Sequence, residues 1–423
     1  MMLLLLASTT GGAQTDSAKV NQLSVGLDFM THGEVAGGGM PKTAGTLETE
    51  NQSRFLLGRV RINADYQRRG LQVHAVVQNK AVWGASGNQA LNLYEGWAKL
   101  TARNGLFAQL GRVALAYDDE RIIGPNDFAV ASKTHDVARL GYEGNGHKAH
   151  VILAYNQNSS NVYNGTYYTG GAQPYKTMQT AWYHYDVPNF PLGASLLFMN
   201  MGLQGGARTV YQQMYGAYVN YHPRGLTIEG SYYRQGGRIV NTDMTAPEID
   251  AWMASAKVTV APSDKYGVTV GYDYLSGDDY VPDLYGGKFG MVRHDVIRGF
   301  SPLYGSNKKF YGIMDYFYES AYAHGFTPGL QNVFIGPYYK PNGKFACRAT
   351  YHYMAVATKV STLDRTLGHC IDLQASYQFT KDIGLSAGYT QMMGTETMER
   401  LKQDDSSQQA RWGWFSLVIS MHN

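Results

Sequence analysis

Charged side chains stand two residues apart in several apolar stretches of the chain. In LLGRVRINADY, residues 56–66, Arg59, Arg61 and Asp65 alternate with Leu, Val, Ile and Ala side chains. Successive side chains of a β-strand point to opposite faces, so these three charges share one face of a strand. Guanidinium groups bind carboxylates through paired hydrogen bonds, and arginine rings in a pore favour anions. The stretch therefore predicts a wall whose polar face can attract anionic solutes.

The same alternation places further charges on the polar faces of other strand-like runs. Lipid cannot satisfy a charge at mid-depth, so in a membrane barrel these faces must point inward. The alternative interpretation is that opposite charges pair across neighbouring strands and only hydrate the wall. The residues expected to line the lumen and set its selectivity are Arg59, Arg61, Asp65, Lys80, Glu95, Lys99, Arg139, Lys148, Arg348 and Asp372.

Runs with period-two alternation recur from end to end, for example at 70–83, 266–275, 371–379 and 383–390. Alternation of this kind indicates half-buried strands. Many runs begin or end in Tyr or Trp, as a barrel requires at its two membrane interfaces. Tandem soluble β-sandwiches would also be rich in strand Tyr, but they need linkers between domains, and the chain has none. The pattern predicts an all-β, transmembrane antiparallel β-barrel.

Bulk composition agrees with this fold class once the alternation is considered. The mean hydropathy of −0.31 resembles that of a soluble protein, but an average hides strands with one apolar face. The sequence contains no run of about 18 apolar residues and therefore no spanning helix. The net charge of +3 is spread along the chain without a basic block, which argues against a nucleic-acid partner.

The connections between runs alternate in length. Short turns rich in Gly, Pro, Asn and Asp stand at 67–70, 102–105, 143–146, 187–191, 222–225, 262–265, 341–343 and 380–382. Longer polar connections stand between them, for example at 118–134, 157–175, 239–247 and 395–408. Each short turn joins two strands, and one strand at each end brings the barrel to about 18. Short periplasmic turns and long extracellular loops are typical of outer-membrane barrels.

One strand-like run exceeds the even number that such a barrel requires. It lies at 308–320, inside residues 278–327, which form the longest connection in the chain. We interpret it as an inserted loop that narrows the channel, because long connections are usually functional. The alternative keeps it in the wall and removes the run interrupted by Pro337. The predicted constriction residues are Asn307, Lys308, Lys309 and Asp315.

The amino terminus, MMLLLLASTTGGAQTD, has a short apolar core followed by small residues. It predicts an export signal over residues 1–13, incomplete because it lacks a positive n-region, and a single barrel domain over 14–423. Export would place the chain in the outer membrane of a Gram-negative bacterium, with lipid and the barrel assembly machinery as partners. Alternation places Cys347 toward lipid and Cys370 toward the lumen, so no disulfide is expected.

Residues 93–142 resemble the early segment of the alginate export family of outer-membrane β-barrels. The resemblance rests on a hairpin that ends in Gly-Arg, an acidic-Arg turn and an Asp-Arg strand. LYGSNKKFYGIMDYF, residues 303–317, resembles a second segment of that family. The resemblance implies an eighteen-stranded channel with a basic lumen that passes anions, but it does not establish alginate as cargo. The chain departs from the common barrel ending, because its last residue is Asn423. The matching residues are Gly111, Arg112, Asp118, Asp119, Glu120, Arg121, Asp136 and Arg139.

Taken together, these patterns predict a porin for passive diffusion of small polar, in particular anionic, solutes through a loop-narrowed channel. One alternative is a dedicated exporter or importer of an anionic polysaccharide or oligosaccharide such as alginate. A second is an outer-membrane enzyme, but no GxSxG, HExxH or P-loop pattern occurs. The acidic cluster at 118–120 is typical of a solvated or cation-binding turn. No metal or cofactor is expected, and homo-oligomers are compatible with the sequence.

Overall fold

The computed structural model of the chain describes residues 21–38, 53–85, 91–128, 132–156, 175–205, 208–240, 246–278, 296–314, 317, 327–360, 363–402 and 409–422. The predicted export signal and Asp315 lie outside these residues. Among the described residues, no helix has both the length and the apolarity needed to cross a membrane.

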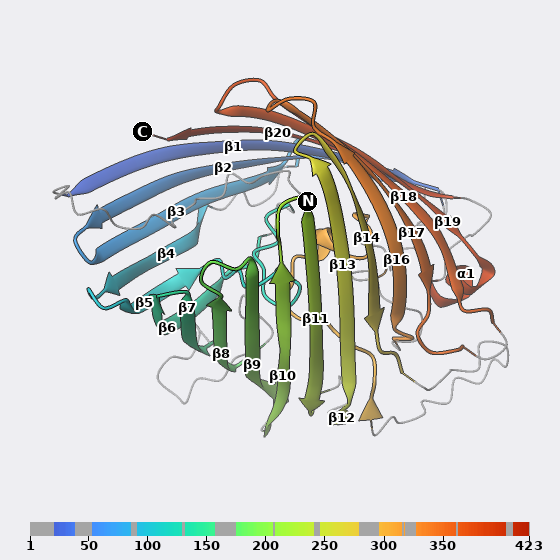
Figure 1. Cartoon of the computed structure of the whole chain (residues 1–423), viewed down its shortest axis with the longest axis horizontal. Coiled ribbons are helices and arrows are strands. Elements are labelled where there is room, and N and C mark those ends of the chain that lie inside the picture. Colours follow the sequence, from blue (N-terminus) through green and yellow to red (C-terminus); the bar gives the residue numbers. More distant parts are fainter. Residues whose placement is uncertain are drawn as a thin grey trace.

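Eighteen antiparallel strands form one closed sheet, as the sequence predicts. Each wall strand pairs with the next along the chain, and β20 pairs with β1 from Gly26↔His422 to Gly37↔Arg411, which closes the ring (Figure 1). The first nine strands are β1 (Gln22–Gly37), β2 (Ser53–Arg68), β3 (Leu71–Val82), β4 (Leu91–Thr101), β5 (Leu106–Val113), β6 (His135–Gly144), β7 (His147–Tyr155), β8 (Thr177–Asp186) and β9 (Leu192–Gly205). The remaining wall strands are β10 (Arg208–Tyr221), β11 (Leu226–Gly237), β13 (Ala251–Ser263), β14 (Tyr266–Leu275), β16 (Leu330–Tyr339), β17 (Phe345–Ala355), β18 (Thr366–Gln378), β19 (Ile383–Gly394) and β20 (Ala410–His422).

The turn chemistry accounts for the hairpins. All eight short turns expected from the sequence join neighbouring strands at one end of the barrel. Gly70, Gly105, Gly146 and Gly225 take positive φ in four of them, which a side chain would resist. The described parts of the longer connections, such as 114–128 and 296–314, leave the wall at the opposite strand ends.

The nineteenth strand-like run is not part of the wall. The wall passes from β14 directly to β16, and residues 307–309 form a single 3₁₀ turn, η1 (Asn307–Lys309). The alternative that removes the Pro337 run is wrong, because β16 contains Pro337 and pairs with both β14 and β17. Outside the wall, β12 (Glu248–Ile249) and β15 (Val296–Ile297) form a small parallel pair. The helix α1 (Glu396–Lys402) follows β19.

Alternation along each strand separates an apolar outer face from a mostly polar inner face. On β2, Val60 and Ile62 are exposed, whereas Arg61 and Asn63, which alternate with them, are buried inside the barrel. The two cysteines occupy opposite faces of neighbouring strands. Cys370 is buried beside Asp372, with an Sγ–Oδ1 distance of 3.6 Å. In the pairing of β17 with β18, Cys347 lies opposite Ala375 and Cys370 lies opposite His352.

The alternation can be tested at adjacent residues of β13. Val258 faces outward and is 38% exposed. Thr259 faces inward, and its hydroxyl forms a hydrogen bond with the hydroxyl of Thr269. We expect Val258→Lys to lower the free energy of unfolding in lipid vesicles by about 2 kcal/mol, because lipid cannot solvate the ammonium group. The matched variant Thr259→Lys should cost much less, because water reaches the inner face. Equal costs measured by urea titration would contradict the assigned faces.

Candidate functional site

Two chain segments fold into the barrel and pair with each other. The first inner segment is residues 114–128, between β5 and β6, and the second is residues 296–314, between β14 and β16. Ile123 and Tyr304 form a parallel bridge, with backbone hydrogen bonds from Gly124 N to Tyr304 O (3.0 Å) and from Tyr304 N to Ile122 O (3.1 Å). The sequence predicted only the second of these as an inward loop. The first was expected to be an ordinary extracellular connection.

The first inner segment crosses the lumen from one wall to the other. Near its start, Asp118 accepts hydrogen bonds from Trp182 of β8 (3.0 Å) and Tyr233 of β11 (3.3 Å). At its other end, the Phe128 ring packs edge-on against Trp414 of β20, with centroids 4.8 Å apart. The acidic cluster was expected to be a solvated or cation-binding turn. It is not solvated, because Asp118 binds the wall and the next two carboxylates pair with Arg121 and Lys309.

The second inner segment is held by the wall on several sides. Ile313 N donates to the Asp372 carboxylate on β18 at 3.1 Å, and Gln235 of β11 donates to Ser301 O at 2.8 Å. Lys308 lies over the Trp412 ring of β20 at 4.4 Å. Of the predicted constriction residues, Lys308 and Lys309 therefore do lie inside the barrel. Asn307 is part of η1.

Arg121 joins both inner segments to the wall. The side chain is 4% exposed and donates to Tyr311 (2.8 Å), Ser255 (3.0 Å) and Asp119 (3.3 Å). A contact of 3.1 Å to Asp273 and the Phe310 ring at 4.1 Å complete its surroundings. Burial opposes the charge, but the neighbouring Tyr311 and Asp273 outweigh it and raise the pKa of Arg121. A charge buried this deeply must keep its partners, so Arg121 sets the position of both segments.

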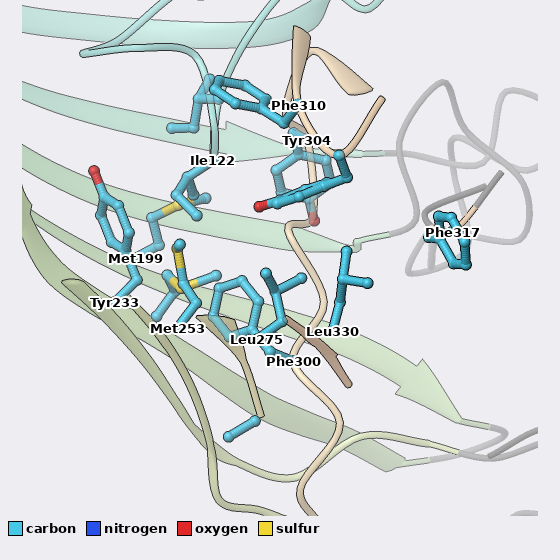
Figure 2. Close-up of a cluster of buried hydrophobic side chains, with 14 of the residues drawn as sticks. Ile122, Met199, Tyr233, Met253, Leu275, Phe300, Tyr304, Phe310, Phe317 and Leu330 are labelled. Carbon is cyan, nitrogen blue, oxygen red and sulfur yellow. The ribbon is translucent and has the colours of Figure 1, made fainter. Parts of the chain in front are cut away.

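Apolar packing fills one side of the lumen. Ile122, Phe300 and Tyr304 of the inner segments meet Met199 of β9 and Met253 of β13, and all five side chains are buried (Figure 2). Met199 and Met253 thus attach the inner segments to β9 and β13, and the same buried cluster continues to Trp412 and Trp414 of β20.

A lumen pocket of about 310 Å³ lies between the inner segments and strands β13–β18 and β20. Its acidic groups are already engaged: Glu120 binds Ser306 and Lys309, Asp273 binds Arg121, and Asp372 binds Thr390 and the second inner segment. Arg348 also lines the pocket, over the Tyr338 ring at 5.7 Å, and its guanidinium has no carboxylate partner among the described residues. The pocket thus presents an uncompensated cation.

Four further predicted basic residues lie on the inner faces of β2, β3 and β6. Arg59 and Arg61 share one carboxylate, Asp127, at 3.0 and 2.9 Å. Within the described residues, Lys80 has no carboxylate partner, and Arg139 reaches Tyr117 OH (3.3 Å) with its Nε unbonded. Cations therefore outnumber carboxylates along β2, β3 and β6.

The remaining predicted lumen residues lie in local pairs near the barrel ends. Lys99 approaches Glu143 at 4.0 Å, Lys148 binds Asp186 at 3.2 Å, and Asp65 binds His74 at 2.6 Å. Glu95 accepts a hydrogen bond from Ala114 N at 3.1 Å and so fixes the start of the first inner segment. For these residues the cross-strand pairing interpretation describes the geometry well.

Two motif residues have roles in the wall. Gly111 takes φ +135°, and a Cβ there would lie 2.1 Å from Gly96 O, so the close approach of β4 and β5 needs glycine. Arg112 faces outward and forms a double hydrogen bond with Asp136, at 2.8 Å for each contact. Neither residue reaches the lumen pocket.

One arrangement resembles the spacing of a hydrolase triad. His184 binds Ser195 Oγ at 2.7 Å and Asp186 Oδ1 at 2.8 Å. However, Ser195 is 2% exposed, so a substrate has no open approach to its hydroxyl. The three side chains therefore connect β8 and β9 on the inner face. Among the described residues, no cluster of His, Cys, Asp and Glu is arranged to hold a metal ion.

No family model matches the sequence, and no curated protein matches it. Solved structures do match the fold. The chain superposes on Pseudomonas aeruginosa OpdL with a TM-score of 0.61 and 14% identity, covering 95% of this chain and 99% of that one. It superposes on P. aeruginosa OccK11 (OpdR) with a TM-score of 0.60 and 12% identity, covering 95% and 96%. P. aeruginosa OccK2 (OpdF), solved in complex with glucuronate, gives 0.59 and 12%, covering 95% and 98%.

The likeness shows the fold alone. Identities of this size do not carry over residue roles, so the site is argued from its own geometry. The comparisons support the closed antiparallel barrel and give no particular support to the alginate export family.

Replacing Arg121 should release both inner segments. We expect Arg121→Met to lower the free energy of unfolding by about 3–5 kcal/mol, because Asp119 and Asp273 would be left buried without their cation. Single-channel conductance in a planar bilayer should rise at the same time. The exposed pair Arg238–Glu248 supplies the control, since Arg238→Ala should change stability by less than about 1 kcal/mol. Unchanged conductance in folded Arg121→Met would show that Arg121 does not set the constriction.

The contact of Asp127 with β2 should survive moderate acid. Burial raises the pKa of Asp127, but Arg59 and Arg61 outweigh it, and the net pKa is lowered. A carboxyl group whose pKa is lower in the folded state contributes its full stability at a pH above its unfolded-state pKa. This contribution is lost as the pH falls through the folded-state pKa. We expect the thermal stability of the native chain to fall as the pH drops below about 4, the unfolded value for Asp, and part of this fall to vanish in Asp127→Asn. Identical pH profiles would rule out the contribution of this contact.

Proposed function

We propose that this chain is an outer-membrane porin that passes small organic anions by passive diffusion. The observation that carries the proposal is the imbalance of lumen charge. Lumen carboxylates are bound by arginines, lysines, hydroxyls or backbone amides, whereas Lys80, Arg139 and Arg348 have no carboxylate partner among the described residues. Free cations on a narrowed polar passage attract and select anions.

The width of the passage favours small solutes. Both inner segments cross the lumen and are tied to the wall by Arg121, Asp118 and Ile313. The remaining lumen pocket, about 310 Å³, is of the size that accommodates a sugar acid or a small dicarboxylate. The glucuronate complex of OccK2 (OpdF), a protein of the same fold, is consistent with a carboxylate-bearing solute here.

The polysaccharide alternative makes a different demand on the same passage. An anionic polymer must thread through the lumen as an extended chain, so it needs continuous width as well as cations. The resemblance of residues 93–142 to the alginate export family supports this alternative, but the two tethered inner segments favour the small solute. The two can be separated by testing alginate oligomers and glucuronate on the same channel.

Charge reversal in the lumen tests the proposal. We expect the native channel to prefer anions in a salt gradient, and Lys80→Glu combined with Arg348→Glu to move the reversal potential toward cation preference. Arg103→Glu, in the exposed turn 102–105, is the matched control and should leave the reversal potential nearly unchanged. Block of ion current by glucuronate should weaken in the double variant only. A native channel with no anion preference, or one in which the double variant behaves as the control does, would refute the proposal.

A further inference from the structure

We propose that the outer face of β5–β8 is an interface between copies of this chain, so that the barrel works as a homo-oligomer. We call the outward side chains of these four strands the short face. The inference concerns the outside of the barrel. It does not depend on the proposed solute or on transport.

The apolar belt is narrow on β5 and β6 of the short face. On β5 the outward apolar residues run from Leu106 to Leu110, between an exposed turn and Arg112. On β6 they run from Ala138 to Tyr142, below Asp136. Each run spans four residue steps, or roughly 14 Å along the strand, and strand tilt shortens its height further. A membrane barrel needs an apolar band about 25 Å tall.

Other parts of the ring meet this requirement. On β13 the outward apolar residues extend from Trp252 to Val260, eight residue steps or roughly 27 Å along the strand. On β2 they extend from Leu56 to Tyr66, which is longer still. The strands β5–β8 are also drawn as short arrows in the wall (Figure 1). If lipid covered the short face, the bilayer would have to thin by about 10 Å beside β5 and β6.

Polar side chains on the outer face make contact with lipid still less favourable. They lie on the short face and on the strands next to it. Arg112 and Asp136 form their double hydrogen bond on the outside of the barrel, with side chains 34% and 48% exposed. Beyond them, outward amides form a ladder across β8, β9 and β10: Asn200 donates to Gln179 at 2.8 Å and accepts from Gln213 at 2.8 Å. Acyl chains offer these groups no further hydrogen bonds, whereas another protein surface does.

The charge of the face indicates which partner covers it. Arg112 is neutralised by Asp136, and the amide ladder carries no charge. An anionic lipid headgroup would need an unpaired cation, and this face presents none among its described residues. A neutral face with both donors and acceptors can instead meet its own copy across a symmetry axis. A second copy therefore fits better than a lipid phosphate.

The surface shape of the short face also suits a protein partner. A groove of about 970 Å³ crosses the outside from β5 to β11, over the small residues Gly141, Ala149 and Ala181. Beside it Leu140 and Leu196 protrude, at 53% and 61% exposure. A second hollow, of about 480 Å³, lies next to Arg112 and Asp136. Protruding side chains next to hollows can interlock with a second copy, and small residues allow the backbones of the two walls to approach.

Cross-linking in native outer membranes tests the inference. Single cysteines would be placed at outward alanines of the short face, Ala138→Cys and Ala181→Cys, in a chain also carrying Cys347→Ala and Cys370→Ser. Ala64→Cys on β2, outward beside Ile62, is the matched control on the long wall. We expect a thiol-reactive bis-maleimide to give covalent dimers at one or both short-face positions. The control should give at least tenfold fewer.

Folding of each variant is checked by heat-shifted gel mobility, and channel conductance is recorded separately, so that failure of transport is distinguishable from failure of assembly. Equal cross-linking at Ala64→Cys would mean random collision and would overturn the inference. The same holds if neither short-face position gives a dimer. In either case lipid covers the short face, and the bilayer must adapt to its narrow belt.

Discussion

The structure depends on the hydrogen bonding of its backbone. Within a bilayer no water is available to strand N–H and C=O groups, so every wall strand must have two neighbours. Pairing of β20 with β1 satisfies the last edge, and side chains support this seam: Ser420 donates to Asp28 at 2.5 Å, and Asn63 also binds Asp28. Once the ring is closed, its diameter is set by the strand number. The lumen is then wide enough that something else must narrow it.

The inner segments meet that need, and their own stability depends on buried charge. A guanidinium inside a low-dielectric space is costly alone but stable with two carboxylates and two hydroxyl partners. Arg121 meets Asp119, Asp273, Ser255 and Tyr311, which come from one inner segment, two wall strands and the other inner segment. One residue therefore couples the positions of both segments to the wall. Rigid placement of this kind keeps the remaining passage narrow.

The same pairing decides which charges would meet a solute in the proposed channel. Carboxylates that hold inner segments in place, such as Asp127 and Asp372, are occupied by their structural partners. Basic residues in excess of these structural needs keep their charge available to the passage. On the outer face, by contrast, the basic residue Arg112 is neutralised by Asp136. The outer face meets lipid, so its charges are paired. The inner face meets water, so it can carry an excess of positive charge.

The sequence by itself determined the barrel. Period-two alternation, aromatic strand ends and short Gly- and Asn-rich turns act between near neighbours, so they predict strand number, faces and hairpins. They also suffice to place Arg61 and Asp372 on the inner face and residues 303–314 outside the wall. The tertiary structure alone decided how the lumen is filled. Arg121 meets Tyr311 across 190 positions of the chain, and Arg59 meets Asp127 across 68. No local pattern encodes such contacts, because they form only after the ring has closed and brought distant segments into one enclosed space.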